Sequence, residues 1–535
     1  MRASDFTGTK TLFKLFLRRD RLLLPIWVLV PSILVFITAG TFAAMATQGL
    51  DSVLTEFNKD PLISALLGPA ISIDLSGAIV WRGTSQIALV LGIGSLLTVI
   101  RHTRTDEETG RSELIRAYVV GPFANLTAAM GLTVIGNLIA GILMGLSIII
   151  LGGEPAGSVL YGATMATVGF FFAGLGALGV QLRENSGTAR GIGITALGLG
   201  LAMAILNNFR GGDTFLKWIN PMAWQRLTQP FSGNYGWNLL YFIAIGMIFT
   251  VIAYILSIHR DLGAGILTAR SGPVEAPPHF SGPLALAWRL HKKSFIGWIV
   301  GTVLYIAAFS AISPGLSSTG GMSDWLSSLG GTNWSNEVGL GYVFISISIY
   351  LISLFVSFYA MSAVLQLKKE ENEGRVEMLV DKQIGRIRWM GSHLIIAYLG
   401  SALLMVIMGV AGGFTYGMIA GNLRNEFWHI FGMCISKIPP VWILLGVTAL
   451  LYGVCPKITA LGWGIWLSFT ILEFAWEGQI IDWSIMCISP FSYVHYTINI
   501  LELPLMPLFW MICISVILTG IGMLGFRNRD ILTKA

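Results

Sequence analysis

The chain has 535 residues, of which 54% are apolar and only 12% are charged. Soluble proteins carry roughly 25% charged residues, so this composition excludes a string of ordinary soluble domains and indicates a membrane protein. The formal net charge of +6 does not indicate nucleic-acid binding. The basic residues lie in short loops between long apolar blocks, where they set the orientation of membrane spans.

The first segment of the chain, residues 9–21, is basic and amphipathic. Its basic and apolar side chains fall on two faces of a helix, Lys10, Lys14, Arg18 and Arg21 against Leu12, Phe13, Phe16 and Leu17. This pattern predicts either a helix on the lipid surface or a basic flank of the first span, and both interpretations stay open. The segment LALAWRLHKK at 284–293 repeats the pattern in the second half of the chain.

Twelve apolar blocks are long enough to cross a bilayer, which takes about 20 residues. They lie near 22–46, 83–101, 126–151, 157–182, 188–208, 237–258, 295–315, 338–366, 390–420, 426–453, 457–477 and 506–526. We therefore expect an all-α polytopic membrane protein with twelve transmembrane helices. A proline-containing polar stretch, 270–281, predicts a cytoplasmic linker between a first six-span repeat, 1–269, and a second, 282–535.

One short motif occurs twice, as EETGRSEL at 107–114 and as ENEGRVEM at 371–378. At one constant offset the identical pairs are Glu107 and Glu371, Gly110 and Gly374, Arg111 and Arg375, Glu113 and Glu377, and Gly121 and Gly385. Matches outside the motif keep the same order along the chain, as for Gly8 with Gly282 and Pro221 with Pro490. The chain is therefore interpreted as an internal duplication, and the twelve spans as two parallel six-helix repeats.

The basic residues predict the orientation of the spans. If both termini and the loops after the even-numbered spans are cytoplasmic, 27 of the 34 Lys and Arg residues lie on that side. This asymmetry satisfies the positive-inside rule. The sequence therefore predicts a multi-pass protein with cytoplasmic N- and C-termini.

No motif indicates chemistry on this chain. The dipeptide Gly-Lys does not occur, so there is no GxxxxGK[ST] loop to cradle a nucleotide. The seven histidines are scattered without metal-ligand spacing. We expect no catalytic residue, no cofactor-binding residue and no metal site, and an energy source on another polypeptide.

The repeated motif is the best candidate for contact with such a partner. In each copy a glycine interrupts the helix that leaves the membrane, and Ser112–Val119 has the length of a short helix with apolar Leu114 and Ile115. An exposed helix that carries Glu and Arg can dock into a groove of a partner. A solvated loop whose charges only fix the topology is the alternative, and the duplication favours docking.

These features together resemble ABC-2 type exporter permeases. The resemblance rests on the paired E-x-x-G-R-x-E-[LM] segments after spans 2 and 8, the amphipathic leading segments, and the segments NPMAW at 220–224 and SPFSY at 489–493. It covers essentially the whole chain. The duplicated twelve-span members, described as exporters of polyketide antibiotics and implicated in tetracycline-type resistance, are the most similar.

The resemblance implies the permease subunit of a bacterial plasma-membrane exporter of amphipathic or hydrophobic compounds, such as antibiotics. The chain itself would not be an enzyme. Two copies of a separate ABC ATPase would bind ATP and Mg, and the other partners would be membrane lipid and a small amphipathic substrate, without nucleic acid. It assigns coupling to the ATPase to Glu107, Gly110, Arg111, Glu113, Glu371, Gly374, Arg375 and Glu377. Because Pro122 is replaced by Arg386 in the second copy, the two contacts are expected to be inequivalent.

Two ionisable residues lie within predicted spans, where charge is costly and often functional. Lys437 lies halfway along span 10, just before two prolines, and Glu473 lies in span 11. They are candidates for lining a substrate path. The alternatives are that Lys437 snorkels to the membrane surface or that the proline break places it in water.

An ion-coupled secondary multidrug transporter is the main alternative function, since such proteins also have twelve spans in two parallel halves. It needs buried carboxylates to carry protons or sodium, and the predicted spans contain few. A membrane-embedded transferase would need clustered acids or histidines, and no such cluster is visible. A four-residue glycine spacing at Gly409, Gly413, Gly417 and Gly421 predicts close helix packing.

Overall fold

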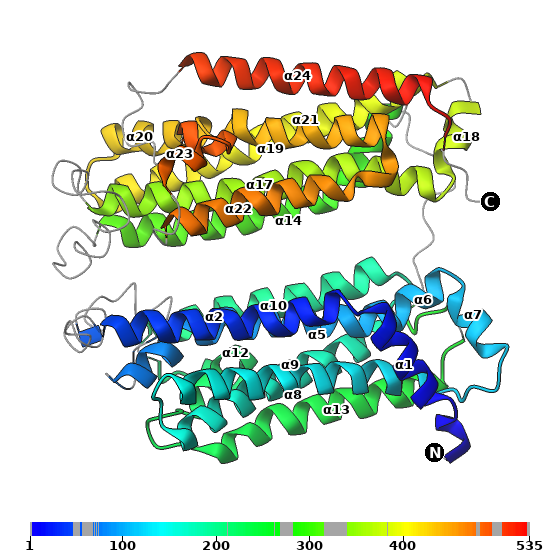
Figure 1. The fold of residues 1–535 in the computed structure, drawn as a ribbon, viewed down its shortest axis with the longest axis vertical. Coiled ribbons are helices and arrows are strands. Elements are labelled where there is room, and N and C mark those ends of the chain that lie inside the picture. Colours follow the sequence, from blue (N-terminus) through cyan, green and yellow to red (C-terminus); the bar gives the residue numbers. More distant parts are fainter. Residues whose placement is uncertain are drawn as a thin grey trace. The chain divides into compact units, whose positions relative to one another are not determined.

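The structure is a computed structural model, and its regular elements are all helical within the residues it describes. Those residues are 3–45, 54–55, 68, 70, 72, 74–210, 212–261, 263–267, 282–314, 340–381, 384–477, 482–494 and 505–531. The linker predicted at 270–281 lies outside them. The chain divides into two compact units, Met1–Gly272 and Pro273–Ala535 (Figure 1).

Helices fill both units. In the first they are η1 Ala3–Phe6, α1 Thr9–Arg19, α2 Leu23–Met45, α5 Leu75–His102, α6 Arg104–Glu108, α7 Arg111–Arg116, α8 Ala124–Ile150, α9 Pro155–Leu182, α10 Ser186–Phe209, α11 Leu216–Ile219, α12 Pro221–Leu227, η3 Gly236–Asn238 and α13 Leu239–Ile258. In the second they are α14 Pro283–Ile312, α17 Leu340–Asn372, α18 Arg375–Asp381, α19 Arg386–Ile419, α20 Leu423–Ile435, α21 Ile438–Val454, η5 Pro456–Ile458, α22 Ala460–Glu477, α23 Trp483–Met486, η6 Pro490–Val494 and α24 Leu505–Asn528.

Eleven stretches of helix among the described residues are long and apolar enough to cross a membrane. They correspond to eleven of the twelve predicted spans. The remaining one, 457–477, forms α22, Ala460–Glu477, in which Ala460–Glu473 is the apolar stretch among the described residues. Pro456 starts the separate turn η5 there, so the first residues of the predicted span do not belong to the apolar helix.

The first unit is built around α9, which packs against α5, α8, α10 and α13. Helix α8 also contacts α2, and α2 contacts α5. Small residues allow the closest of these approaches: a Cβ on Gly141 of α8 would lie 2.4 Å from the carbonyl oxygen of Gly162 on α9. Backbones that close leave no room for a side chain, so the glycines set the distance between the two helices.

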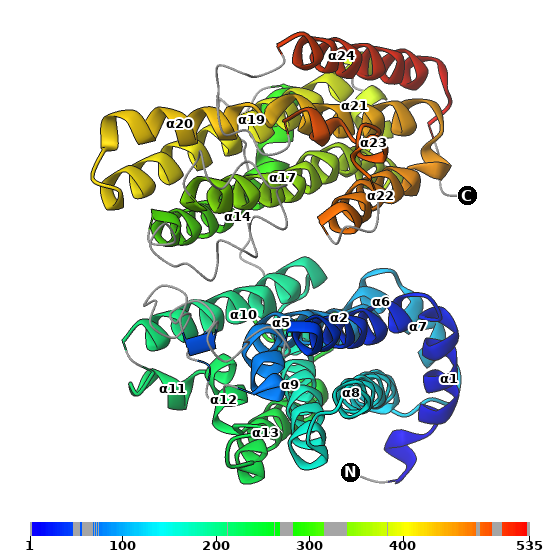
Figure 2. The ribbon, with the colours of Figure 1, turned by 60° about the vertical axis from the view of Figure 1, so that its left-hand side comes forward.

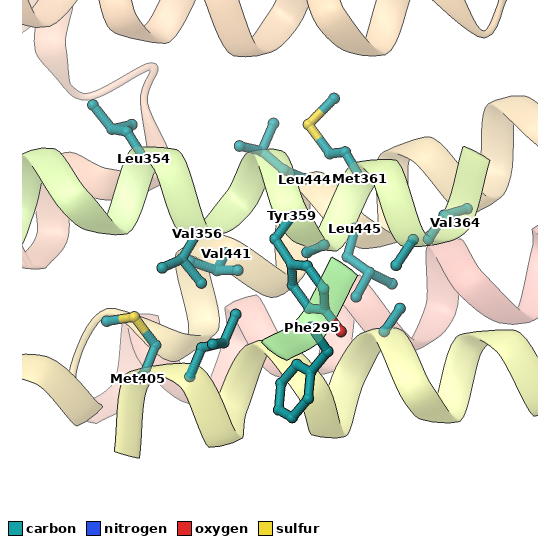
Figure 3. Close-up of a cluster of buried hydrophobic side chains, with 14 of the residues drawn as sticks. Phe295, Leu354, Val356, Tyr359, Met361, Val364, Met405, Val441, Leu444 and Leu445 are labelled. Atoms are coloured by element: carbon teal, nitrogen blue, oxygen red, sulfur yellow. The ribbon is translucent and has the colours of Figure 1, made fainter. Parts of the chain in front are cut away.

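The second unit repeats these neighbour relations. Helix α21 packs against α17, α22 and α24, while α19 packs against α14 and α17 (Figures 1 and 2). Its core lies between α14, α17, α19 and α21, where the rings of Phe295 and Tyr359 pack with their centroids 5.9 Å apart and Met405, Val441 and Leu445 lie around them (Figure 3). The buried residues of these helices are mostly apolar, with serine, threonine and histidine side chains among them, and close packing of such side chains holds helices together within a membrane.

The predicted glycine packing is confirmed for most of the glycine row. Gly409, Gly413 and Gly417 of α19 face α20, where an added Cβ would lie about 3 Å from Phe431, Phe427 and Leu423 respectively. Gly421 lies in the turn after α19 with a φ of +76°, so it serves the turn and not the helix contact.

The two amphipathic leading segments differ. In the first unit α1 is a separate helix that ends before Asp20, and it buries Leu12 and Phe16 against α8 while Lys10 and Lys14 stay exposed. In the second unit the segment 284–293 is continuous with the span in α14. Of the two predicted forms, the basic flank of a span therefore describes 284–293, because no break separates this segment from the membrane helix.

Candidate functional site

The duplicated motif lies at one end of each unit, where α6 and α7 close the first bundle and α18 closes the second (Figure 1). The helix break predicted at the glycines is confirmed: Gly110 has φ +71° and Gly374 has φ +72°. This left-handed conformation is readily adopted only by glycine, so the same residue is required in both copies. The short helix in the first unit ends at Arg116 and does not extend to Val119.

Four of the predicted coupling residues are exposed. Arg111 and Glu113 of the first copy and Arg375 and Glu377 of the second all face away from their bundles. Apolar neighbours are exposed beside them, with Leu114 70% and Met378 62% accessible. Each copy therefore presents a basic, an acidic and an apolar side chain at the surface of one short helix.

Among the described residues, the ion pairs of the exposed arginines are local. Arg111 lies 3.6 Å from Asp106, whose carboxylate is held more closely by Arg19 at 2.7 Å. Arg375 donates to Glu370 at 2.6 Å and also pairs with Glu373. The hydrogen bond to Glu370 raises the pKa of Arg375, so this side chain stays charged at any pH the protein meets.

The first matched glutamate, by contrast, is buried inside the unit. The Glu107 carboxylate accepts hydrogen bonds from both terminal nitrogens of Arg260, at 2.6 and 2.8 Å, and a third from Arg104 at 2.6 Å. The Glu107 and Arg260 side chains are each 7% exposed, and Arg104 is fully buried. Arg260 lies just after α13, the last helix of the unit, so the motif is tied to the end of that helix.

Glu371 makes the matching contact in the second unit. Arg529, directly after α24, donates two bonds to its carboxylate at 2.6 and 2.7 Å. Tyr452 of α21 donates a third at 2.8 Å, and the Arg529 guanidinium lies over the Tyr452 ring at 5.2 Å. Paired, hydrogen-bonded carboxylates of this kind are the form in which buried charge is stable. Glu107 and Glu371 therefore occupy positions unlike those of Glu113 and Glu377.

A cation three residues before each glutamate, Arg104 or Lys368, completes the arrangement. Arg104 donates to the carbonyl of Glu184 at 2.7 Å, in the turn between α9 and α10. Lys368 donates to the carbonyl of Pro456 at 2.7 Å, in the turn between α21 and α22. In both units the segment that leads into the glycine of the motif is thus anchored to the turn after the fourth span of that unit.

The sequence analysis missed the residues that hold the two glutamates. The signal was available for one pair: Arg260 and Arg529 each follow the last apolar block of a unit, with the same spacing that relates Pro221 to Pro490. Nothing in the sequence distinguishes Tyr452 from the other tyrosines in the spans. Only the packing brings it to Glu371.

The short helix α7 packs less tightly against the bundle than the ion-paired side chains of Glu107 and Arg260 do. A cavity of about 40 Å³ lies beneath it, lined by Ser112, Ile115, Gln181 and Arg260 among others. The hydroxyl of Ser112 is buried and has no hydrogen-bond partner among the described residues. The cavity has the size to hold a water molecule or two, and beside it Ile115 of α7 packs against the apolar cluster of α1 and α8.

The two intramembrane candidates, Lys437 and Glu473, are both fully buried in the second unit. Lys437 lies at the break between α20 and α21 and donates a hydrogen bond to the carbonyl of Val494 in η6. Glu473 of α22 accepts a bond from Tyr350 of α17 at 2.6 Å, and it lies within electrostatic range of the Lys437 ammonium. Because the Lys437 side chain is 0% exposed, neither snorkelling nor contact with bulk water describes it. The role of these two residues in a substrate path stays a prediction.

Two comparisons with known proteins place the chain in a family. Residues 280–527 match the family profile described as "Multidrug efflux system permease Rv1217c, C-terminal domain". Over 99% of its length the chain is 32% identical to the "Multidrug efflux system permease protein Rv1217c" of Mycobacterium tuberculosis (strain ATCC 25618 / H37Rv), and the alignment covers 96% of that protein. With its many apolar helices of membrane-spanning length, the chain is a multi-pass membrane protein and belongs to the family of multidrug efflux system permeases.

Proposed function

We propose that this chain is the membrane-spanning subunit of an ABC-2 type exporter, driven by a separate ATPase, that moves amphipathic or hydrophobic compounds out of the bacterial cell. One observation carries the proposal. The same short helix after a left-handed glycine presents the same exposed residues in both units, Arg111 with Glu113 and Arg375 with Glu377. A partner that binds as two copies would need two such surfaces.

The architecture proposed for this function is two parallel repeats of six spans in the plasma membrane, with both termini cytoplasmic. The repeated neighbour relations of the helices support it. The paired clusters around Glu107 and Glu371 support it further, since each joins the motif to the end of the last helix of its unit. Parallel repeats put both motifs on the same side of the membrane, where one kind of ATPase reaches both.

In this mechanism ATP and Mg are bound by the partner. Closure of two ATPase copies moves the short helices α7 and α18, and those helices transmit the movement to the spans. A conformational change of this kind needs a partner that interacts differently with the two states. The substrates proposed are those of a multidrug permease, including tetracycline-type and polyketide antibiotics.

An ion-coupled secondary multidrug transporter is the second candidate. The buried Glu473, with Lys437 close by, is the observation that favours it, because a protonatable carboxylate inside a membrane helix can carry a coupling proton. The first unit offers no match for this carboxylate among the residues described in α10, the helix in the position of α22. We therefore favour ATP-driven export.

The two mechanisms are separated by the energy source of transport in inside-out membrane vesicles from the native host. We expect ethidium and tetracycline to accumulate when ATP is added, also after an ionophore has collapsed the proton gradient. A non-hydrolysable ATP analogue should give no accumulation. Accumulation that needs only the proton gradient would reject the ABC mechanism, and vesicles lacking this chain serve as the control.

The proposed orientation has its own test in a variant without native cysteines. Asp213 lies in an exposed external turn of the predicted topology, and Glu113 is exposed on α7 on the cytoplasmic side. In intact cells an impermeant thiol reagent should label Asp213→Cys and should leave Glu113→Cys unlabelled until the membrane is opened. Labelling of Glu113→Cys in intact cells would reverse the orientation.

A further inference from the structure

We propose that the buried ion pairs Glu107–Arg260 and Glu371–Arg529 are the joints that carry movement of the coupling motif to the last membrane helix of each unit. The inference rests on the proposed ATP-driven function and adds a positioning role for four side chains. The two glutamates belong to the motif that matches between the repeats, yet neither is placed to touch a partner. Their exposure is 7% and 1%, against 57% for Arg111.

The geometry of both pairs is that of a stiff connection. Each arginine presents two nitrogens to two carboxylate oxygens, at 2.6 and 2.8 Å in the first unit and at 2.6 and 2.7 Å in the second. Bidentate pairs of this type fix orientation as well as distance. A shift or rotation of the helix end that carries Glu107 is therefore passed to Arg260, and with it to the end of α13.

The position of each pair in the chain suits it to transmit movement. The glutamate lies three residues before the left-handed glycine that separates the short helix from the membrane span, and the arginine lies directly beyond the last span of the unit. The short helix itself packs over a small cavity in the first unit. Ile115 of α7 packs against the apolar cluster of α1 and α8, and Glu107 adds a charged connection from the flank of α7 to the end of α13.

The clusters of the two units share one contact and differ in another. The third partner of the carboxylate differs between units, Arg104 in the first and Tyr452 in the second, while the bidentate arginine from the last span is kept in both. The feature common to both units is the link between the motif and that span. We infer that this link is the shared element of coupling.

The test measures export per ATP hydrolysed with the full-length chain, purified with its ATPase and reconstituted in proteoliposomes, with ethidium as the transported probe. Neutralising the pair, by Glu371→Gln or Arg529→Gln, should leave the ATPase bound and hydrolysing ATP. The amount of ethidium moved per ATP should fall by about 2- to 30-fold, the range expected for residues that modulate coupling between sites. The matched control is Asp213→Asn, which neutralises an exposed, ion-paired carboxylate outside the coupling motif.

A charge exchange separates coupling from folding. Glu371→Arg with Arg529→Glu restores an ion pair in the second unit and should recover most of the native transport per ATP. The exchange belongs in the second unit because in the first the introduced arginine would face Arg104. In the first unit, Glu107→Gln and the double variant Glu107→Gln with Arg260→Gln should uncouple to the same degree, since each breaks the same link.

The outcomes are distinct. Native transport per ATP in both neutralised variants would refute the proposed role of the ion pairs as joints. So would export and hydrolysis that fall in parallel with the amount of folded protein and do not recover on charge exchange, since that result assigns the pair to stability alone. If the native chain itself moves no ethidium with ATP, the proposed function fails, and the joint fails with it.

Discussion

Reversing the charge of the two exposed arginines, Arg111→Glu with Arg375→Glu, should detach the ATPase while leaving the permease folded. Within the chain these side chains are 57% and 45% exposed, and exposed ion pairs contribute only about 0–1 kcal/mol. Asp106 keeps its closer partner Arg19 when Arg111 is changed. We therefore expect normal membrane insertion and, from Arg111→Glu, only a small shift in thermal unfolding.

At an interface with the ATPase the same substitutions should cost far more free energy. Removing one side of a partly buried charge contact costs about 2–5 kcal/mol, and at about 1.4 kcal/mol per tenfold the affinity should fall by about 30-fold or more per site. The assay titrates full-length permease in nanodiscs with the purified ATPase, and Arg210→Glu serves as the control because Arg210 is exposed outside the motif.

The two single variants should differ. Arg375→Glu places a carboxylate beside Glu370 and Glu373, the present partners of Arg375. Arg111 itself lies 3.6 Å from one described carboxylate, that of Asp106, which Arg19 also neutralises. Like charges at such distances repel, so Arg375→Glu should lower both stability and affinity more. A double variant that binds the ATPase with native affinity would refute the docking role of both arginines.

Further predictions concern packing and buried charge. Gly162→Leu introduces a Cβ that would lie 2.2 Å from the carbonyl oxygen of Gly141 and should lower stability by about 1–3 kcal/mol or more, measured as a drop in melting temperature in detergent. The control Gly191→Leu, at an open position, should melt close to the native temperature. Equal melting temperatures of the two variants would contradict the close packing. Lys437→Met leaves the buried Glu473 without its nearby cation and should cost about 3–5 kcal/mol. Adding Glu473→Gln should recover much of that loss, and a single variant as stable as the native chain would show that the two charges do not depend on each other.

Much of the fold follows from local pattern. Apolar blocks of span length appear in the sequence without reference to any other part of the chain, and eleven of the twelve have the length of a span in the structure. The helix break at Gly110 and Gly374 was likewise predictable, because a glycine between a membrane helix and a charged segment is a local signal. The helix of segment 457–477 begins only at Ala460, because Pro456 starts a separate turn at Pro456–Ile458, and a composition average over a whole window does not show such a boundary.

The sequence by itself determined which residues of the motif are repeated, but the roles of those residues depended on tertiary structure. Glu107 and Glu113 are both charged, both matched in the second copy and only six positions apart. One is buried against Arg260, 153 residues further along the chain, and the other faces outward. Glu371 likewise pairs with Arg529 across 158 residues. Such pairs form only when the last helix of a unit packs beside the helix that leads into the motif. The apolar faces of the helices decide this packing, and the sequence does not show which helix each face will contact.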